Sequence, residues 1–413
     1  MSALALPPRP GANKRSRSRR SRTAALPILK RLVTRALQYR TSDIHLEPCP
    51  EGLRVRYRID GILRHVETLP SELRQRAIVA LKAVSNLDIT EHRRPQDGRI
   101  GGSEGRSLLH NLDLRVSTLP CLGGEKAVIR LLPRNNPFSS LDTLGFPDRS
   151  LQIYRRWLRQ PQGLIVIAGP TGSGKSSTLY TSLQSLPTHE VNVVTIEDPI
   201  EYVSPNMTQM QVNPQIGVTF ASGLRSILRQ DPDIIMVGEV RDRETAQIVV
   251  QAALTGHLVF TTVHTRDTVS AISRLMELGA DVGLLGDLLL GVVSQRLVRR
   301  VCPHCATFSP PTDADLQELE LPRDGVNPEA WRRGRGCPKC FESGYLGREA
   351  LVELLDFDRD LRGMVRRGDV DGLRCHLDDT EFYSFDRAAL DKLTQGVTTL
   401  PEIRRVLPRL SDT

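Results

Sequence analysis

Residues 163–177 read Gly163-Leu-Ile-Val-Ile-Ala-Gly-Pro-Thr-Gly-Ser-Gly-Lys-Ser-Ser177, an apolar run of strand length that leads directly into a glycine-rich loop. In the pattern G-x4-G-K-[ST], backbone N–H groups converge on a phosphate chain, the lysine reaches the β and γ phosphates, and the hydroxyl binds Mg²⁺. The periodicity that follows predicts a helix over residues 177–186, whose N-terminal dipole also favours phosphate. The flanking strand and helix argue against an ordinary glycine-rich turn. We therefore predict a nucleotide site formed by Gly169, Pro170, Thr171, Gly172, Ser173, Gly174, Lys175, Ser176 and Ser177.

The length and composition indicate a soluble protein with two domains. The chain has 413 residues, of which 39% are hydrophobic and 25% charged, as in ordinary globular proteins. No apolar segment reaches the roughly 18 residues that are needed to cross a bilayer. No signal-peptide core follows the basic residues near the start. We expect a cytoplasmic protein that reaches a membrane only through a partner.

The net charge of +8 is concentrated at the N-terminus. Residues 1–25 contain seven basic residues and no acidic residue, which leaves about +1 for the rest of the chain. This segment is rich in Pro, Ser and Arg, so we expect a disordered tail. It is either merely solvated or contacts acidic lipid or nucleic acid nonspecifically. The basic residues are Arg9, Lys14, Arg15, Arg17, Arg19, Arg20 and Arg22.

Residues 26–136 are expected to form an α+β domain. Apolar residues recur at helical spacing over residues 26–39, and they alternate with three arginines over residues 53–59, as in a half-buried strand. Two later strands carry Arg115 and Arg130. The three arginines of the 53–59 strand, Arg54, Arg56 and Arg58, form either a solvated face or an interface that reaches a neighbouring subunit's nucleotide.

Two acidic motifs follow β-rich runs after the phosphate loop. Ligands of parallel α/β sheets bind at the carboxyl ends of the strands. Glu197 follows the strand predicted at 191–196, where a carboxylate could polarise an attacking water; a turn or N-cap acid is the alternative. Glu239 follows the apolar strand 234–237. Gly238 stands where many phosphate-loop enzymes have Asp, so we expect Glu239 to be the carboxylate that contacts Mg²⁺ directly or through water.

Two histidines bracket the predicted strand at residues 258–263. His257 precedes it and His264 follows it. We expect both to offer neutral imidazole donors to a γ-phosphate at the active edge of the sheet. A purely structural role is the alternative for each.

Four of the seven cysteines form two Cys-x2-Cys motifs separated by 31 residues. In a reducing cytoplasm such pairs indicate a metal site before they indicate disulfides. Four thiolates suit a closed, structural Zn²⁺ site, and reduced cysteines without metal are the alternative. The predicted ligands are Cys302, Cys305, Cys337 and Cys340. Short helical patterns beyond Gly347 predict a helical end to the domain.

In its motifs, the chain resembles the hexameric secretion ATPases of type II secretion and type IV pilus assembly. The similarity covers about residues 27–410, in the order found in that family, and the set is far more specific than a phosphate loop alone. Besides the phosphate loop and the cysteines, the matching stretches are TSDIHLEP (41–48), PQDGR (95–99), TIEDPIE (195–201), LRQDPD (228–233), MVGEVRD (236–242) and ALTGH through HT (253–265).

This resemblance implies a fold and a division into domains. It implies an α/β chain in which a smaller α+β, PAS-like domain precedes a RecA-like P-loop NTPase motor domain. The expected segments are a basic tail (1–25), the N-terminal domain (26–136) and the ATPase domain (137–413) with its zinc-binding insert (302–340). The tetracysteine insert is typical of secretion and pilus-extension members, so an extension type is favoured.

The resemblance also implies roles for the candidate residues. Glu197 matches the water-activating acid, Glu239 the acid associated with Mg²⁺, and His257 and His264 the histidine box. Arg115 and Arg130, together with Arg99, match arginines that the first domain brings to the nucleotide, where they would neutralise charge during phosphoryl transfer.

The resemblance implies hydrolysis of ATP with Mg²⁺ by a homohexamer that acts on an inner-membrane platform. We expect peripheral membrane association through partners, location at the inner face of the inner membrane, and no specific nucleic acid. Family members often begin with an extra platform-docking domain, where this chain has only the basic tail. The alternatives are a nucleic-acid translocase on the same core, which the nearly neutral body disfavours, and an ATP-binding scaffold without hydrolysis.

Overall fold

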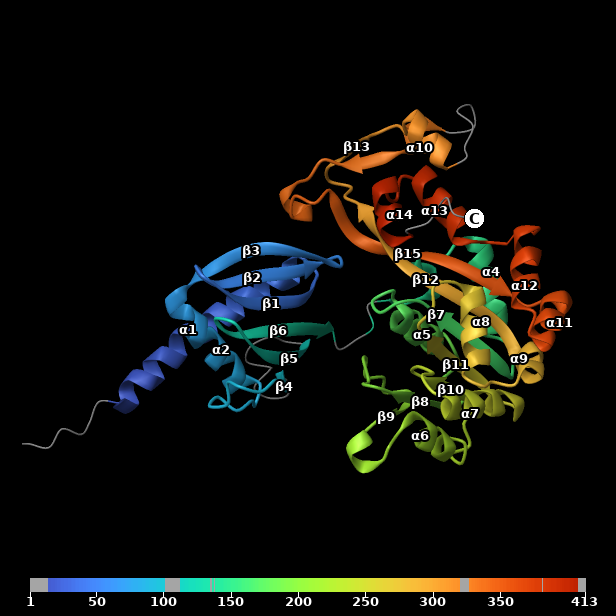
Figure 1. Ribbon diagram of the computed structural model, residues 1–413, viewed down its shortest axis with the longest axis horizontal. Coiled ribbons are helices and arrows are strands. Elements are labelled where there is room, and N and C mark those ends of the chain that lie inside the picture. Colours follow the sequence, from blue (N-terminus) through green and yellow to red (C-terminus); the bar gives the residue numbers. More distant parts are fainter. Residues whose placement is uncertain are drawn as a thin grey trace, which may run out of the picture. The chain divides into compact units, whose positions relative to one another are not determined.

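Figure 1 shows a computed structural model of the protein, which describes residues 14–100, 112–133, 136, 138–319, 327–380 and 382–407. The chain forms two compact units, Met1–Pro133 and Arg134–Thr413. Among the described residues, no helix combines the length and the apolar character needed to cross a membrane.

The first unit is a six-stranded antiparallel sheet with two helices on one face. The strand order is β3-β2-β1-β6-β5-β4. Apolar residues of both helices pack on the sheet, including Leu29, Val33 and Leu81 against Leu114 and Ile129. The elements are α1 (Lys14–Gln38), β1 (Thr41–Cys49), β2 (Gly52–Ile59), β3 (Ile62–Pro70), α2 (Ser71–Val84), β4 (Gln96–Ile100), β5 (Leu112–Cys121) and β6 (Gly124–Pro133).

The first helix begins earlier than the sequence pattern predicts. α1 starts at Lys14, so residues 14–25 are helical and the expectation of a disordered tail is wrong for them. Arginine and alanine are good helix formers, and they allow the amphipathic helix to extend towards the N-terminus. Residues 1–13 of the expected tail lie outside the described residues.

The second unit is built on a seven-stranded, mostly parallel sheet. The strand order is β15-β12-β7-β11-β10-β8-β9, and only β15 runs antiparallel to its neighbour. All residues of β7, β8, β10 and β11 are buried, as expected for strands covered on both faces. The strands are β7 (Gly163–Ala168), β8 (Val193–Glu197), β9 (Thr208–Gln211), β10 (Ile234–Val237), β11 (Leu258–Val263), β12 (Leu289–Val301) and β15 (Tyr345–Asp356).

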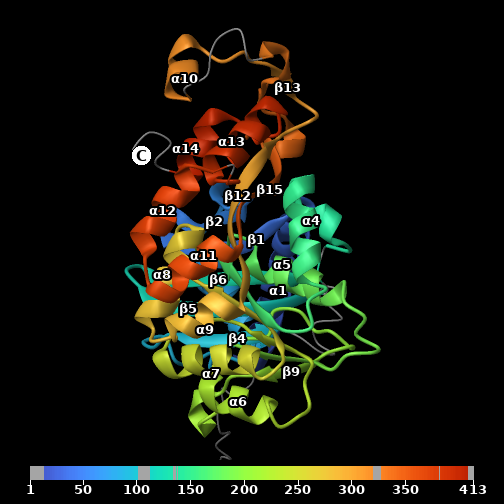
Figure 2. The ribbon, with the colours of Figure 1, turned by 90° about the vertical axis from the view of Figure 1, so that its right-hand side faces the viewer.

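Helices cover both faces of this sheet. Side chains of β7 alternate between two hydrophobic clusters: Leu164 and Val166 face one, Ile165 and Ile167 the other. Figure 2 shows α8 and α11 on one side of β12, and α4 and α5 on the other. The helices are α4 (Asp148–Trp157), α5 (Lys175–Gln184), α6 (Phe220–Ile227), α7 (Arg243–Leu254), α8 (Thr268–Glu277), α9 (Val282–Leu288), α11 (Arg359–Arg367), α12 (Val370–Asp378), α13 (Phe385–Thr394) and α14 (Leu400–Val406).

The chain between β12 and β15 forms a small excursion that contains the four cysteines. It holds the two-stranded sheet of β13 (Ala306–Phe308) and β14 (Arg332–Gly334), and the helix α10 (Asp313–Glu318). β12 and β15 pair along most of their length, and both extend the central sheet. The prediction of a helical end beyond Gly347 is therefore incomplete, because β15 precedes the helices.

Candidate nucleotide-binding site

The phosphate loop connects β7 to α5 and is closely packed against β12. Gly169 and Gly174 have φ angles of 144° and 91°, which favour glycine. A Cβ atom on Gly169 would lie 2.5 Å from the carbonyl oxygen of Gln295, and one on Gly174 would lie 2.8 Å from the Gln295 side-chain nitrogen. These glycines therefore allow Gln295 of β12 to pack directly against the loop.

Lys175 is the first residue of α5 and points back into the loop. Its Nζ donates to the carbonyl oxygens of Gly169 at 2.8 Å and Pro170 at 3.1 Å. Burial lowers the pKa of Lys175 to about 8, although the charges of Glu239 and Glu201 oppose this shift. An anionic ligand beside the ammonium group would favour its charged form.

A cavity of about 310 Å³ opens beside the loop at the carboxyl ends of the parallel strands. The loop contributes Lys175 and Ser176, while Glu197, Glu239 and His264 follow or end β8, β10 and β11. Three candidate side chains from distant parts of the sequence thus meet the phosphate-loop donors in one cavity. Its position is the one that parallel α/β sheets use for ligands.

Glu197, the last residue of β8, is 4% exposed and is held by three donors. Tyr180 Oη donates to one carboxylate oxygen at 2.5 Å; Thr195 Oγ1 at 2.7 Å and Gln209 Nε2 at 3.2 Å donate to the other. Burial raises the pKa of Glu197, and these hydrogen bonds act in the opposite direction. The carboxylate is therefore fixed in orientation and poorly hydrated, as suits a proton acceptor.

Glu239 lies two residues beyond the end of β10, between the guanidinium of Arg241 and the imidazole of His264. One carboxylate oxygen is 2.5 Å from Arg241 Nη2, and the other is 3.5 Å from His264 Nε2. Burial lowers the pKa of His264, as does the charge of Lys175, while Glu239 raises it. A neutral imidazole is thus favoured at this position.

The structure separates the two histidines. His264 follows the carboxyl end of β11 and lines the cavity, whereas His257 precedes the amino end, at the opposite edge of the sheet. His257 Nδ1 lies 2.8 Å from the carbonyl oxygen of Ala252, at the end of α7. The expectation that both histidines line one edge is wrong for His257, because a fully buried strand runs between them.

The candidate arginines lie in the first unit, in one row across its sheet. Arg99 pairs with Arg115 and Arg115 with Arg130 in the strand register, so their side chains share a face. Arg130 Nε donates to Asp43 Oδ1 at 2.9 Å. Their proposed role at a nucleotide stays a prediction.

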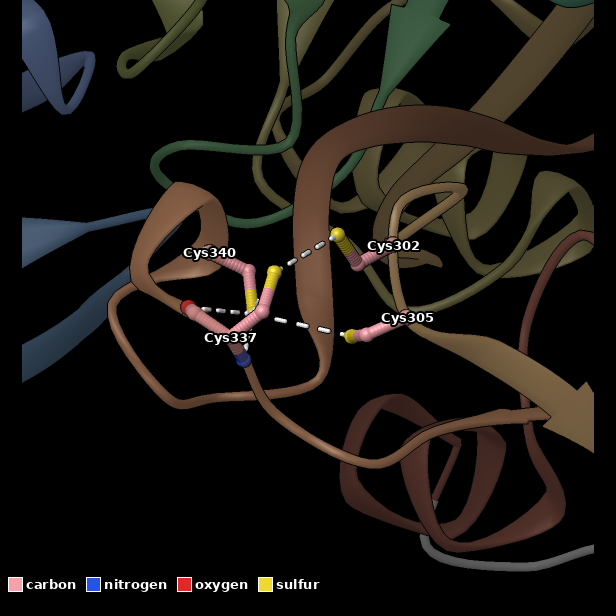
Figure 3. Close-up of side chains that lie close together, drawn as sticks. All are labelled: Cys302, Cys305, Cys337 and Cys340. Atoms are coloured by element: carbon pink, nitrogen blue, oxygen red, sulfur yellow. Dashed lines mark hydrogen bonds between the residues drawn. The ribbon is translucent and has the colours of Figure 1, made fainter.

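The four cysteines converge from two loops (Figure 3). All four Sγ atoms lie within 4.8 Å of one another; Cys302 and Cys337 are 3.9 Å apart, as are Cys305 and Cys340. Sulfurs about 2.3 Å from one tetrahedral ion would lie about 3.8 Å apart, so the donor set and spacing fit Zn²⁺. The backbone N–H groups of Cys337 and Gly344 also donate to Cys340 Sγ.

Sequence patterns did not identify several residues that support the cavity. Tyr180 and Gln209 hold Glu197, and Gln295 of β12 accepts a hydrogen bond from Thr178 Oγ1 at 2.8 Å. Tyr180 follows the phosphate loop within an ordinary helical pattern, which contains no signal for a partner 17 residues later. Only the fold brings such pairs together.

The chain is similar to known proteins in sequence and in fold. Residues 19–405 match the family described as "Type II/IV secretion system protein". The chain belongs to this family. The type II secretion system protein E of Klebsiella pneumoniae is 42% identical over 379 residues, which cover 92% of this chain and 75% of that protein. The type IV pilus assembly ATPase PilB of Thermus thermophilus is 43% identical over 92% of this chain, but the match spans 43% of PilB.

Among solved structures, the pilus retraction motor PilT with bound ADP is similar to this chain. The TM-score is 0.64 at 25% identity, and the match covers 93% of this chain and 97% of PilT. The fold is the mixed α/β fold of these ATPases. Membership of the family places the chain among the ATP-hydrolysing enzymes.

Proposed function

We propose that this chain is the ATPase that powers assembly of a type IV pilus or a type II secretion pseudopilus. The observation that carries the proposal is the single cavity in which Lys175 and Ser176 meet Glu197, Glu239 and His264. The relatives named above are a secretion protein and a pilus assembly ATPase, and the tetracysteine cluster favours an extension or secretion role over retraction.

ATP would bind with its phosphates in the loop. Lys175 would exchange its two carbonyl acceptors for β and γ oxygens, a change that favours its protonated form. Ser176 and Glu239 would hold Mg²⁺, because hard cations prefer hydroxyl and carboxylate oxygens. The ion would supply neutralisation of the phosphate charge. Glu239 would meanwhile keep Arg241 and His264 beside the transferring group.

Glu197 would accept the proton of the attacking water. Its three hydrogen-bond donors orient the carboxylate, and its burial makes the carboxylate a stronger base than a hydrated one. His264, favoured as a neutral imidazole, would donate to a γ-phosphate oxygen as charge develops there. Arg115 and Arg130 would supply further positive charge from the first domain.

In the cell, six copies would form a ring at the inner face of the inner membrane. There the ring would move a membrane platform that polymerises pilin-like subunits. Zn²⁺ held by the four cysteines would have a structural role, since four thiolates leave no open coordination position.

The test is release of phosphate from ATP by the purified, zinc-replete oligomer, with and without its membrane partner. Lys175→Ala is expected to abolish release, while Lys30→Ala, which removes an exposed lysine of α1, serves as the matched control. Absence of Lys175-dependent release in the presence of the partner would refute the proposal. Stimulation by single-stranded DNA with steep salt dependence would favour a nucleic-acid translocase instead.

A further inference from the structure

The segment 264–268 connects β11 to α8 and begins at the nucleotide cavity. Its first residue, His264, lines the cavity and lies 3.5 Å from Glu239. Its last residue, Thr268, is the first residue of α8. The position of His264 therefore depends on how this short connection is held.

A buried acid holds the far end of the connection. Glu353 Oε1, on β15, accepts hydrogen bonds from the backbone N–H and the hydroxyl of Thr268, both at 2.7 Å. Glu353 is 6% exposed, and burial raises its pKa to about 7. Burial of an acid is unfavourable unless its contacts compensate, so its presence here calls for a specific purpose.

The middle of the connection is held from the adjacent strand. The carbonyl oxygen of Arg266 accepts from Arg296 Nη2 at 2.5 Å and from Ser294 Oγ at 3.4 Å. Ser294 of β12 is the direct strand partner of Glu353. The two neighbouring strands thus fix the connection at successive points.

We propose that Glu353 is a positioning residue for ATP hydrolysis, which fixes His264 in the nucleotide cavity by holding Thr268. The inference rests on the proposed function, since it assigns His264 to the reacting phosphate. A displacement of about 1 Å at a reacting centre can lower a rate about a hundredfold. Without Glu353, the connection would keep its contacts at Arg266 but lose its anchor at Thr268, which would permit such a displacement.

A double-mutant cycle separates this role from a merely structural one. Glu353→Ala is expected to lower kcat about ten- to a hundredfold with little change in the KM for ATP. In the His264→Ala background, the same change is expected to cost no more than the roughly twofold scatter of independent mutations. Glu353→Gln keeps an acceptor oxygen of the same shape and should recover most of the loss. Equal losses in both backgrounds would overturn the proposal.

The matched control is Glu402→Ala in α14. Glu402 is also a buried acid of this unit, and it accepts hydrogen bonds from Arg299 on β12. Any change in kcat caused by Glu402→Ala should be the same in the parent and in the His264→Ala background, because the hydrogen bonds of Glu402 do not involve the 264–268 connection. If Glu353→Ala does not fold, Thr268→Val can replace it, because that change removes only the hydroxyl donor. It should lower kcat less than Glu353→Ala, and it should have no further effect on kcat in the His264→Ala background.

Hydrogen exchange tests the anchor without relying on activity. In the full-length, nucleotide-free protein, the Thr268 amide should exchange about tenfold or more faster in Glu353→Ala, because its hydrogen bond to the Glu353 carboxyl group is lost. Unchanged exchange would overturn the inference. If the Thr268 amide exchanges faster in Glu353→Ala but the parent protein shows no Lys175-dependent hydrolysis, the anchor is confirmed and the proposed function is refuted instead.

Discussion

Replacement of Tyr180 by phenylalanine should change the pH at which ATP hydrolysis begins. The Tyr180 hydroxyl donates to Glu197 at 2.5 Å, and this hydrogen bond lowers the pKa of a carboxyl that burial raises. The ring remains in Tyr180→Phe, so its edge-on packing against Tyr202 at 5.1 Å should persist. The variant therefore removes one donor from the proposed base, together with the hydroxyl oxygen that accepts from Gln209 Nε2 at 2.9 Å.

The magnitude follows from the charge of the acceptor. A hydrogen bond to a charged group contributes about 1.5–3 kcal/mol, and one pKa unit corresponds to about 1.4 kcal/mol. Because Glu197 must be ionised to accept a proton, activity is present above its pKa and is lost as the pH falls through it. Without the Tyr180 donor, the acid limb of kcat/KM should move to higher pH by about one to two units.

The assay is the pH profile of kcat/KM for phosphate release. Tyr154→Phe is the matched control, because Tyr154 is also fully buried but its hydroxyl lies 2.7 Å from Ser182 Oγ, away from any acid of the cavity. Its acid limb should coincide with that of the parent. An acid limb in Tyr180→Phe that coincides with the parent would refute the assignment of Glu197 as the base, as would an equal loss of rate at every pH.

Three further predictions concern the phosphate loop, the histidines and the cysteines. ATP affinity should fall as pH rises through about 8, because the free enzyme then loses the Lys175 proton. Calorimetry in buffers of different ionisation enthalpy should detect proton uptake when ATP binds. This uptake should disappear in Lys175→Met. His264→Ala should lower kcat about tenfold or more, whereas His257→Ala should change thermal stability but not kcat, which steady-state kinetics and thermal melts distinguish. Metal analysis should find about one zinc per chain. Cys305→Ser or chelation should destabilise the excursion between β12 and β15 by several kcal/mol, which local hydrogen exchange measures. Unchanged exchange would contradict a structural metal.

Much of the second unit can be predicted from local patterns. The strand before the phosphate loop, the helix after it, and the strands at 234–237 and 258–263 are where apolar runs and turn signals indicate them. Glu197 and Glu239 could be placed near the nucleotide because parallel strands end at a common edge. The same reasoning is misleading for His257, since a residue beside a strand can lie at either of its ends.

Strands β12 and β15 show where local patterns are insufficient. β12 follows α9 almost without a break, and its apolar residues continue the helical run before it. β15 lies beyond the cysteine excursion, so its pairing with β12 joins residues far apart in the sequence. These two strands provide Gln295, Arg296 and Glu353, none of which belongs to a recognisable motif.

The sequence alone determined the chemistry: a glycine loop with its lysine, acids after apolar strands, and four thiols in two pairs. These features depend on residue type and short spacing, which a linear chain displays directly. The tertiary structure decided which groups act together. In the folded chain, Tyr180 contacts Glu197, His257 and His264 lie at opposite ends of β11, and Glu353 contacts the 264–268 connection. Such contacts arise from strand order and helix packing, which bring together residues that no sequence spacing relates.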